Sequence, residues 1–228
     1  FIRALGREAE SRAAALSAGR GGETDTLYFG GGTPSMLSDT HLGRLMETLD
    51  RLVPVDKLDE FSFEANPATF TEKKVRFWRS LGMTRVSLGV QSLDSGILHL
   101  LGREHTPAQA LHSVEMLKNA GMAHINMDLM FAIPGQTLSI WEATLKEAVR
   151  AGTDHISAYN LTYEEDTEFF RSLLRGEKRQ DPDEDAAFFE LAEHMLEAAG
   201  LRHYETSNYA REGCRSPHNM AYWKGEDY

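Results

Sequence analysis

The sequence predicts an α/β fold, a partial barrel in which helices alternate with the strands of a parallel sheet, incomplete at both ends. Two observations predict it. Five β-rich runs, each followed by a helical pattern, are centred 34, 25, 39 and 31 residues apart, at positions 27, 61, 86, 125 and 156. These intervals are close to the βαβ unit of about 30 residues. A complete eight-stranded barrel needs about 250 residues, so the 228 residues here suit a (β/α)6-type part of one.

The elements can be expected in chain order. Residues 1–20 carry apolar side chains at helical spacing and end in glycines, which predicts an opening helix, with no strand before it. Ser38 and Asp39 are expected to cap a second helix. The other expected elements are strands at 26–29, 61–64, 85–90, 124–131 and 155–161, a helix at 185–199, and a sixth strand at 204–207.

The composition excludes several classes of protein. With 24 basic and 35 acidic residues the net charge is −11, so we expect no nucleic-acid binding that relies on neutralising phosphates. Residues 164–197 hold most of this acidity and are interpreted as a solvated face without function. The most apolar stretch, 129–134, is far shorter than the roughly 20 residues of a membrane span. A single cysteine, Cys214, favours a reducing, cytoplasmic location.

Polar residues stand where the predicted strands end, which is where parallel barrels bind ligands. Gly31, Gly32 and Thr33 follow the first strand, Glu64 closes the second, and Gln91 follows the third. The glycines allow close approach of the backbone to a ligand. A turn without function, or a satisfied strand-end amide, is the simpler alternative for the loop and for Gln91.

Asp128 lies inside an apolar strand, where an unpaired carboxylate would cost several kcal/mol. It must therefore meet a cation, hydrogen-bond donors or a ligand. Arg103 is a possible structural partner, and Glu64 faces the same choice between a structural and a binding role.

Near the end of the chain, His218 precedes two large aromatic residues, Tyr222 and Trp223. An imidazole beside flat apolar side chains suits an iron porphyrin. The alternative is an aromatic cluster that closes one end of the barrel.

Several motifs occur in order along nearly the whole sequence, and together they resemble those of the radical S-adenosylmethionine (SAM) proteins related to oxygen-independent coproporphyrinogen III oxidase. The segment His218-Asn219-Met220-Ala221-Tyr222-Trp223 is similar to the HNxxYW motif of the heme chaperone (HemW) branch. The other motifs are YFGGGTPS at 28–35, EANP at 64–67, LGVQS at 88–92, LGREHT at 101–106, DLM at 128–130, IPGQT at 133–137 and YETSNYA at 204–210.

The resemblance implies a partial barrel whose strand ends bind S-adenosylmethionine against a 4Fe-4S cluster. By correspondence with the family, His218 contacts heme, and Asn219, Tyr222 and Trp223 surround it. The expected contacts with S-adenosylmethionine are Gly31, Gly32, Thr33, Glu64, Gln91, Arg103 and Asp128.

Three departures from the family accompany the resemblance. The CxxxCxxC loop that holds the cluster is absent, so its ligands are expected outside this chain, and no metal ligand is assigned within it. Relatives continue past residue 228 into a C-terminal domain. Residues 1–200 are then expected to form the partial barrel, and 201–228 its last strand and the HNxxYW segment. Ser216-Pro217 precedes His218 where relatives often carry arginine, and Cys214 is an alternative ligand for heme iron.

Three functions stay open. The preferred one is a heme carrier that delivers heme to an acceptor protein, with possible peripheral contact at a membrane. The rival is an enzyme that oxidatively decarboxylates coproporphyrinogen III in porphyrin biosynthesis. The third is a small-molecule-binding protein without a cluster, which the missing cysteines would support.

Overall fold

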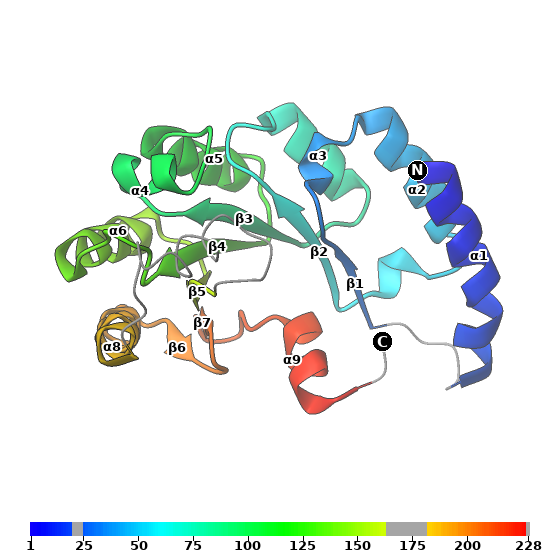
Figure 1. Cartoon of the computed structure of the whole chain (residues 1–228). Coiled ribbons are helices and arrows are strands. Elements are labelled where there is room, and N and C mark those ends of the chain that lie inside the picture. Colours follow the sequence, from blue (N-terminus) through cyan, green and yellow to red (C-terminus); the bar gives the residue numbers. More distant parts are fainter. Residues whose placement is uncertain (20–24, 163–181, 227–228) are drawn as a thin grey trace, which may run out of the picture. The chain divides into compact units, whose positions relative to one another are not determined.

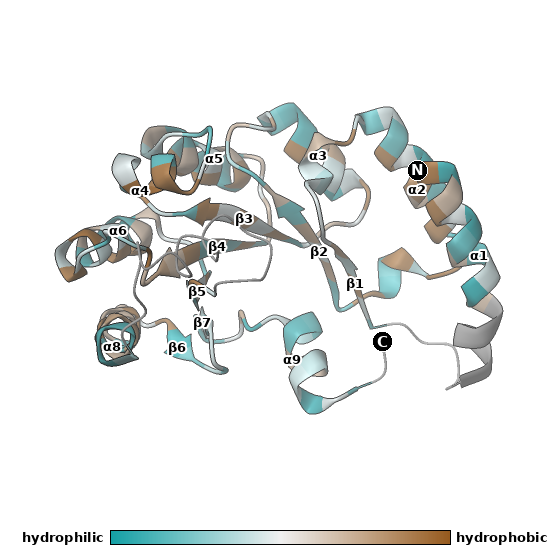
Figure 2. Cartoon of the chain, in the orientation of Figure 1, coloured by the Kyte–Doolittle hydropathy of each residue, from teal (hydrophilic) through white to brown (hydrophobic). Residues whose placement is uncertain are grey.

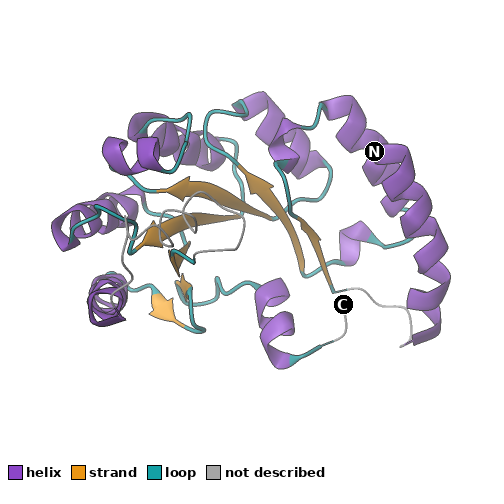
Figure 3. Cartoon of the chain, viewed as in Figure 1, coloured by secondary structure: helices purple, strands orange, loops and turns teal. Residues whose placement is uncertain are grey.

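The computed structural model describes residues 1–19, 25–162 and 182–226. Helices and strands alternate along most of this part of the chain (Figure 3). The strands are β1 (Thr26–Phe29), β2 (Glu60–Ala65), β3 (Arg85–Gln91), β4 (His124–Phe131), β5 (His155–Asn160), β6 (Arg202–His203) and β7 (Asn208–Ala210). The α-helices are α1 (Ile2–Gly19), α2 (Asp39–Leu49), α3 (Glu72–Ser80), α4 (Ser95–Leu100), α5 (Pro107–Asn119), α6 (Leu138–Ala151), α8 (Pro182–Ala198) and α9 (Pro217–Lys224).

The strands form one sheet in the order β1-β2-β3-β4-β5-β7-β6. β1 pairs in parallel with β2, and β4 with β5, whereas β7 is antiparallel to both β5 and β6. The sheet is mostly parallel and does not close, which confirms the predicted α/β partial-barrel class. Teal and brown bands alternate along helices such as α2 and α6 (Figure 2), as expected where one helix face enters the core.

The sixth strand predicted at 204–207 is wrong. These residues connect β6 to β7, and Tyr204 N donates to Asn208 O at 3.1 Å to close the connection. The Glu205 carboxylate accepts from Ser207 N at 3.2 Å. Polar side chains that bond to nearby backbone favour a turn over a strand, which explains why 204–207 connect two strands instead of forming one.

The chain divides into two compact units. The first unit consists of Phe1–Ser87, Glu115–Ile125 and Ser216–Tyr228, and the second of Leu88–Val114 and Asn126–Arg215. In the first unit, Phe63 of β2 and Trp78 of α3 are fully buried with ring centroids 4.7 Å apart. Helix α9, in red in Figure 1, lies beside the first strand, β1.

The second unit is built on β4 and β5. Met127 and Leu129 of β4 are fully buried, and so is Trp141 of α6. The Trp141 Nε1–H donates to Phe188 O of α8 at 3.0 Å, which joins the two helices that cover these strands. Residues 164–181 of the acidic segment predicted at 164–197 lie outside the described residues, and the rest of the segment belongs to α8.

Local signals explain where the helices begin and end. The Ser38 hydroxyl accepts from His41 N at the start of α2, as predicted, while Asp39 occupies the first turn. The Ser216 hydroxyl caps α9, and Pro217 takes its first position, where a fixed φ and a missing N–H are favourable. Pro217 therefore begins the helix that carries His218. None of the described helices has the length and hydropathy needed to cross a membrane.

Candidate functional site

The glycines after β1 serve two different purposes. Gly31 and Gly32 have φ values of 77° and 63°, a left-handed conformation that side chains disfavour, and a Cβ at either position would meet nothing within 4 Å. Their outer side is therefore open. At Gly30, by contrast, a Cβ would lie 2.4 Å from the Tyr28 ring and 2.8 Å from Glu64 Oε1. Gly30 is needed because these two side chains pack directly over it.

Glu64, at the end of β2, holds this loop in place. Its Oε1 accepts from the Tyr28 hydroxyl at 2.5 Å, and its Oε2 accepts from Gly31 N at 2.9 Å. The Asn66 side chain donates to Thr33 Oγ1 at 3.3 Å. Glu64 thus holds Gly31 directly, Asn66 holds Thr33, and the binding role of these residues stays a prediction.

His218 lies in the first turn of α9, against β1. Its Nδ1 is 2.8 Å from Thr26 Oγ1, and its ring stacks on Tyr28 with centroids 4.9 Å apart and planes 9° from parallel. Burial lowers the pKa of His218 below its ordinary value, and the charge of Glu60 only partly opposes this shift. The imidazole is therefore neutral near pH 7.

The other residues of the HNxxYW segment stand on the same helix. Asn219 N donates to Ser216 Oγ as part of the helix cap. Tyr222 and Trp223 are 66% and 54% exposed and meet edge to face, with centroids 6.0 Å apart. The ring stacked on His218 belongs to Tyr28, for which the sequence predicted no binding role.

Gln91, Arg103 and Asp128 lie in the second unit. Gln91 ends β3 with φ 67°, an unusual conformation for a residue other than glycine. Asp128 accepts from Asn126 Nδ2 at 2.7 Å. Burial lowers the pKa of Arg103 while the charge of Asp128 opposes that shift, and burial with the same charge raises the pKa of Tyr159 to about 12. The negative charge of Asp128 therefore acts on both Arg103 and Tyr159. The role of Asp128 in ligand binding stays a prediction.

Gln91 is not the only residue near a strand end with an unusual backbone conformation. The three described non-glycine residues with positive φ are Ala68, Gln91 and Ala132, and each stands at or just after the carboxyl end of β2, β3 or β4. Such conformations cost about 1–3 kcal/mol and cluster at functional sites. No residue type in the sequence signals them.

A buried polar network in the second unit was not predicted. Asn126 Nδ2 donates to Asp128 Oδ1 and to Ser157 Oγ, and Asn126 Oδ1 lies 2.7 Å from His155 Nδ1. His155 Nε2 in turn lies 2.8 Å from the Tyr204 hydroxyl. Because a carboxylate only accepts hydrogen bonds, Asn126 Nδ2 donates to Asp128, so Asn126 Oδ1 accepts from His155 Nδ1–H. With its proton on Nδ1, a neutral His155 accepts at Nε2 from the Tyr204 hydroxyl.

A buried ion pair in the first unit was also not predicted. Arg85 Nε donates to Glu60 Oε2 at 2.5 Å, and both side chains are almost fully buried. Glu60 Oε1 accepts from Ser216 Oγ at 2.6 Å. Ser216 therefore both caps α9 and ties it to β2, and the Ser-Pro pair at 216–217 was the available sequence signal for this helix.

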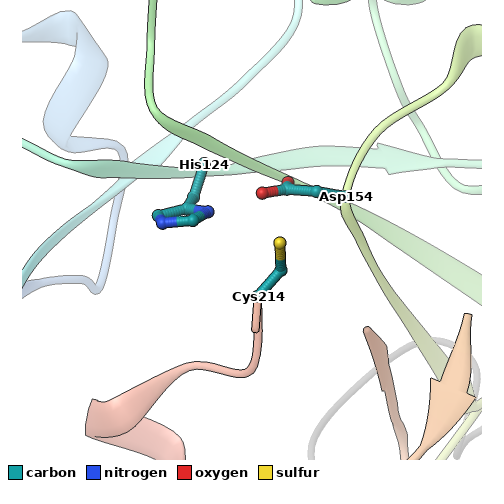
Figure 4. A group of neighbouring side chains, drawn as sticks. All are labelled: His124, Asp154 and Cys214. Carbon is teal, nitrogen blue, oxygen red and sulfur yellow. The ribbon is translucent and has the colours of Figure 1, made fainter. Parts of the chain in front are cut away.

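Cys214 supplies the only thiol of the chain. Its Sγ lies within 4.8 Å of a carboxylate oxygen of Asp154, a residue of the same unit. Figure 4 shows the thiol pointing toward this carboxylate. One thiolate cannot replace the three that a 4Fe-4S cluster needs besides a bound ligand. The residues of this chain therefore do not by themselves fit the cluster.

The class of protein follows from the fold and from a family comparison. Residues 7–148 match the model of the radical SAM superfamily, and the chain belongs to this superfamily. The fold is similar to coproporphyrinogen III oxidase (HemN) of Escherichia coli, a radical SAM enzyme, with a TM-score of 0.81 at 24% identity over 99% of this chain and 51% of that one. Membership implies S-adenosylmethionine and a 4Fe-4S cluster as cofactors.

Particular relatives are more specific. The chain is similar to the heme chaperone HemW of Bacillus subtilis, at 36% identity over 205 residues covering 89% of this chain and 54% of that protein. It is also similar to HemW of Mycobacterium tuberculosis, at 37% identity over 99% of this chain and 57% of that protein. The chain spans about half the length of the curated relatives it matches. The resemblance stated from the sequence motifs is confirmed.

Proposed function

We propose that this chain is the radical SAM part of a heme chaperone, which binds heme and transfers it to an acceptor protein. The observation that carries the proposal is the setting of His218, a neutral imidazole on a helix whose exposed side carries Tyr222 and Trp223. The similarity to HemW proteins along 89% of the chain supports it.

His218 has the chemistry of an iron ligand. A neutral imidazole binds a metal through one nitrogen while the other donates a hydrogen bond that fixes the ring. Thr26 Oγ1 is placed to accept from Nδ1–H, and within the described part of the chain His218 Nε2 has no hydrogen-bond partner. Nε2 then presents its lone pair to the iron. The exposed rings of Tyr222 and Trp223 offer apolar area for the porphyrin.

The same proposal assigns the S-adenosylmethionine contacts. In the first unit, Gly31, Gly32, Thr33 and Glu64 would hold the ligand, and the open side of the two glycines fits a backbone that a ligand approaches closely. For the second unit, the family resemblance supports Gln91, Arg103 and Asp128 as proposed contacts with S-adenosylmethionine. With a cluster whose thiolates come from outside this chain, bound S-adenosylmethionine supplies radical chemistry.

The decisive experiment is a heme titration of the full-length protein, with His218→Ala compared with Cys214→Ser. We expect His218→Ala to abolish the heme absorption band or shift it to the blue, because the iron loses its imidazole. Cys214→Ser should leave the band unchanged. The opposite pattern would assign the iron to the cysteine, and no change in either variant would refute an axial ligand in this region.

The rival function is oxidative decarboxylation of coproporphyrinogen III, which the HemN-like fold makes worth an assay. Turnover of coproporphyrinogen III by a protein that shows no saturable heme binding would replace the carrier proposal. We also propose a cytoplasmic location, where thiols stay reduced, and peripheral contact with a heme acceptor at a membrane.

A further inference from the structure

One side chain, Tyr28 of β1, lies between the proposed heme ligand and the glycine loop. One face of its ring stacks on His218. Its hydroxyl donates to Glu64, whose other oxygen holds Gly31 N. The ring and the hydroxyl of the same residue therefore contact two groups that the proposed function assigns to different ligands.

The ring acts together with Thr26. These residues are two apart on β1, so their side chains leave the strand on the same side. Thr26 Oγ1 fixes the imidazole at Nδ1, and the Tyr28 ring, 4.9 Å away and nearly parallel, fixes the plane of the imidazole. Two constraints of different kinds, one polar and one from stacking, set the direction in which Nε2 points.

The hydroxyl acts on the loop. A tyrosine O–H bonded to a carboxylate at 2.5 Å is a charge-assisted hydrogen bond, which is stronger than a neutral one. It holds Glu64 in the position from which Oε2 reaches Gly31 N at 2.9 Å. Gly30 lets the ring and the carboxylate close over the backbone, since any Cβ there would collide with both.

We propose that Tyr28 is a positioning residue shared by the two sites: its ring orients His218 toward heme iron, and its hydroxyl holds Glu64 and the glycine loop ready for S-adenosylmethionine. This inference rests on the proposed function. It adds that the two ligand sites of the first unit depend on separate parts of one side chain.

The test compares Tyr28→Phe with Tyr28→Leu in the full-length protein with its cluster reconstituted. Heme binding is followed by absorption titration and S-adenosylmethionine binding by calorimetry. Phenylalanine keeps the ring and removes only the hydroxyl, so heme affinity should stay within about twofold while S-adenosylmethionine affinity falls about 3- to 10-fold. Leucine removes both parts, so both affinities should fall. Tyr209→Phe, which removes a buried hydroxyl in the second unit, is the matched control and should change neither affinity.

The outcomes separate this inference from the proposed function. If His218→Ala leaves heme binding intact, or Glu64→Ala leaves S-adenosylmethionine binding intact, the corresponding assignment of the proposed function is wrong. If those variants lose their ligands while Tyr28→Phe and Tyr28→Leu bind both normally, the role of Tyr28 alone is refuted. If Tyr28→Phe weakens heme binding and S-adenosylmethionine binding equally, the proposal is also refuted. Such a result would indicate a general loss of structure, whereas the proposal requires that loss of the hydroxyl affect only S-adenosylmethionine binding. Thermal unfolding of each variant measures that loss directly.

Discussion

At the scale of single residues, identical letters in the sequence carry different physical roles. Gly30, Gly31 and Gly32 are three identical residues in a row, and the sequence predicted only that the backbone at these glycines can approach a ligand closely. The structure separates them: Gly30 makes room for neighbouring side chains, whereas Gly31 and Gly32 adopt left-handed φ values. Packing partners that come from other strands are invisible in the local sequence, so this distinction could not be predicted.

His218 leads to a prediction about pH. Because burial lowers its pKa from the ordinary 6.5, His218 in the folded protein stays neutral where an exposed histidine is already half protonated. Heme affinity should therefore stay level as the pH falls from about 8 to about 6.5, and decline only below that, when a proton competes with iron for Nε2. Heme titrations at half-unit steps of pH measure this.

The same shift affects stability, and its sign is defined. The unfolded chain takes up the proton near pH 6.5 and the folded chain only at lower pH, so the free energy of unfolding should fall as the pH drops below about 6.5. His218→Gln should show a smaller fall over this range. A heme affinity that already declines at pH 7.5 would contradict a neutral, half-buried imidazole at His218.

At the scale of elements, the strands were predicted well and the polar contacts between them were not. The strands at 26–29 and 124–131 have the predicted bounds, because apolar runs between turn residues fix them locally. The single strand predicted at 204–207 is wrong, because these residues form the connection between β6 and β7, where the Glu205 side chain accepts a hydrogen bond from Ser207 N. The network from Asp128 to Tyr204 depends on pairing between β4, β5 and β7, which spacing along the chain does not reveal.

This network yields a prediction with a matched control. Tyr204→Phe removes the donor to His155 Nε2 and should lower the free energy of unfolding by about 1–2 kcal/mol, because a buried acceptor loses its partner. Tyr209→Phe removes a hydroxyl that is buried without a hydrogen-bond partner among the described residues, so it should leave stability unchanged or slightly raised. Urea denaturation of both variants compares them. Equal effects of the two substitutions would mean that the Tyr204 hydrogen bond contributes nothing.

At the scale of the whole molecule, class and family were predictable and the division into units was not. Repeated strand–helix spacing gave the mostly parallel sheet, and the ordered motifs gave the superfamily, because both are written along the chain. The two compact units each combine segments from distant parts of the sequence. The boundary predicted at residue 200 follows chain order and remains a prediction. Discontinuous units arise from long-range packing, which a linear pattern does not encode.

The cysteine content leads to a prediction for the chain as a whole. Because the 228 residues contain one thiol, anaerobic reconstitution of this chain alone should give only background iron and sulfide. The full-length protein, treated in the same way, should take up about four of each per cluster. A stoichiometric cluster on the 228-residue chain would overturn the expectation that its ligands lie elsewhere.

The position of α9 has a consequence for the order of folding. The contact between His218 and Thr26 joins residues 192 positions apart, and the anchor from Ser216 to Glu60 spans 156. Contacts of such separation close large loops and form late, and during synthesis the strands that receive α9 emerge long before it does. The imidazole site is therefore completed only when one of the last described elements docks on the first strand, so a nascent chain that has not yet reached α9 has no His218 to offer to heme.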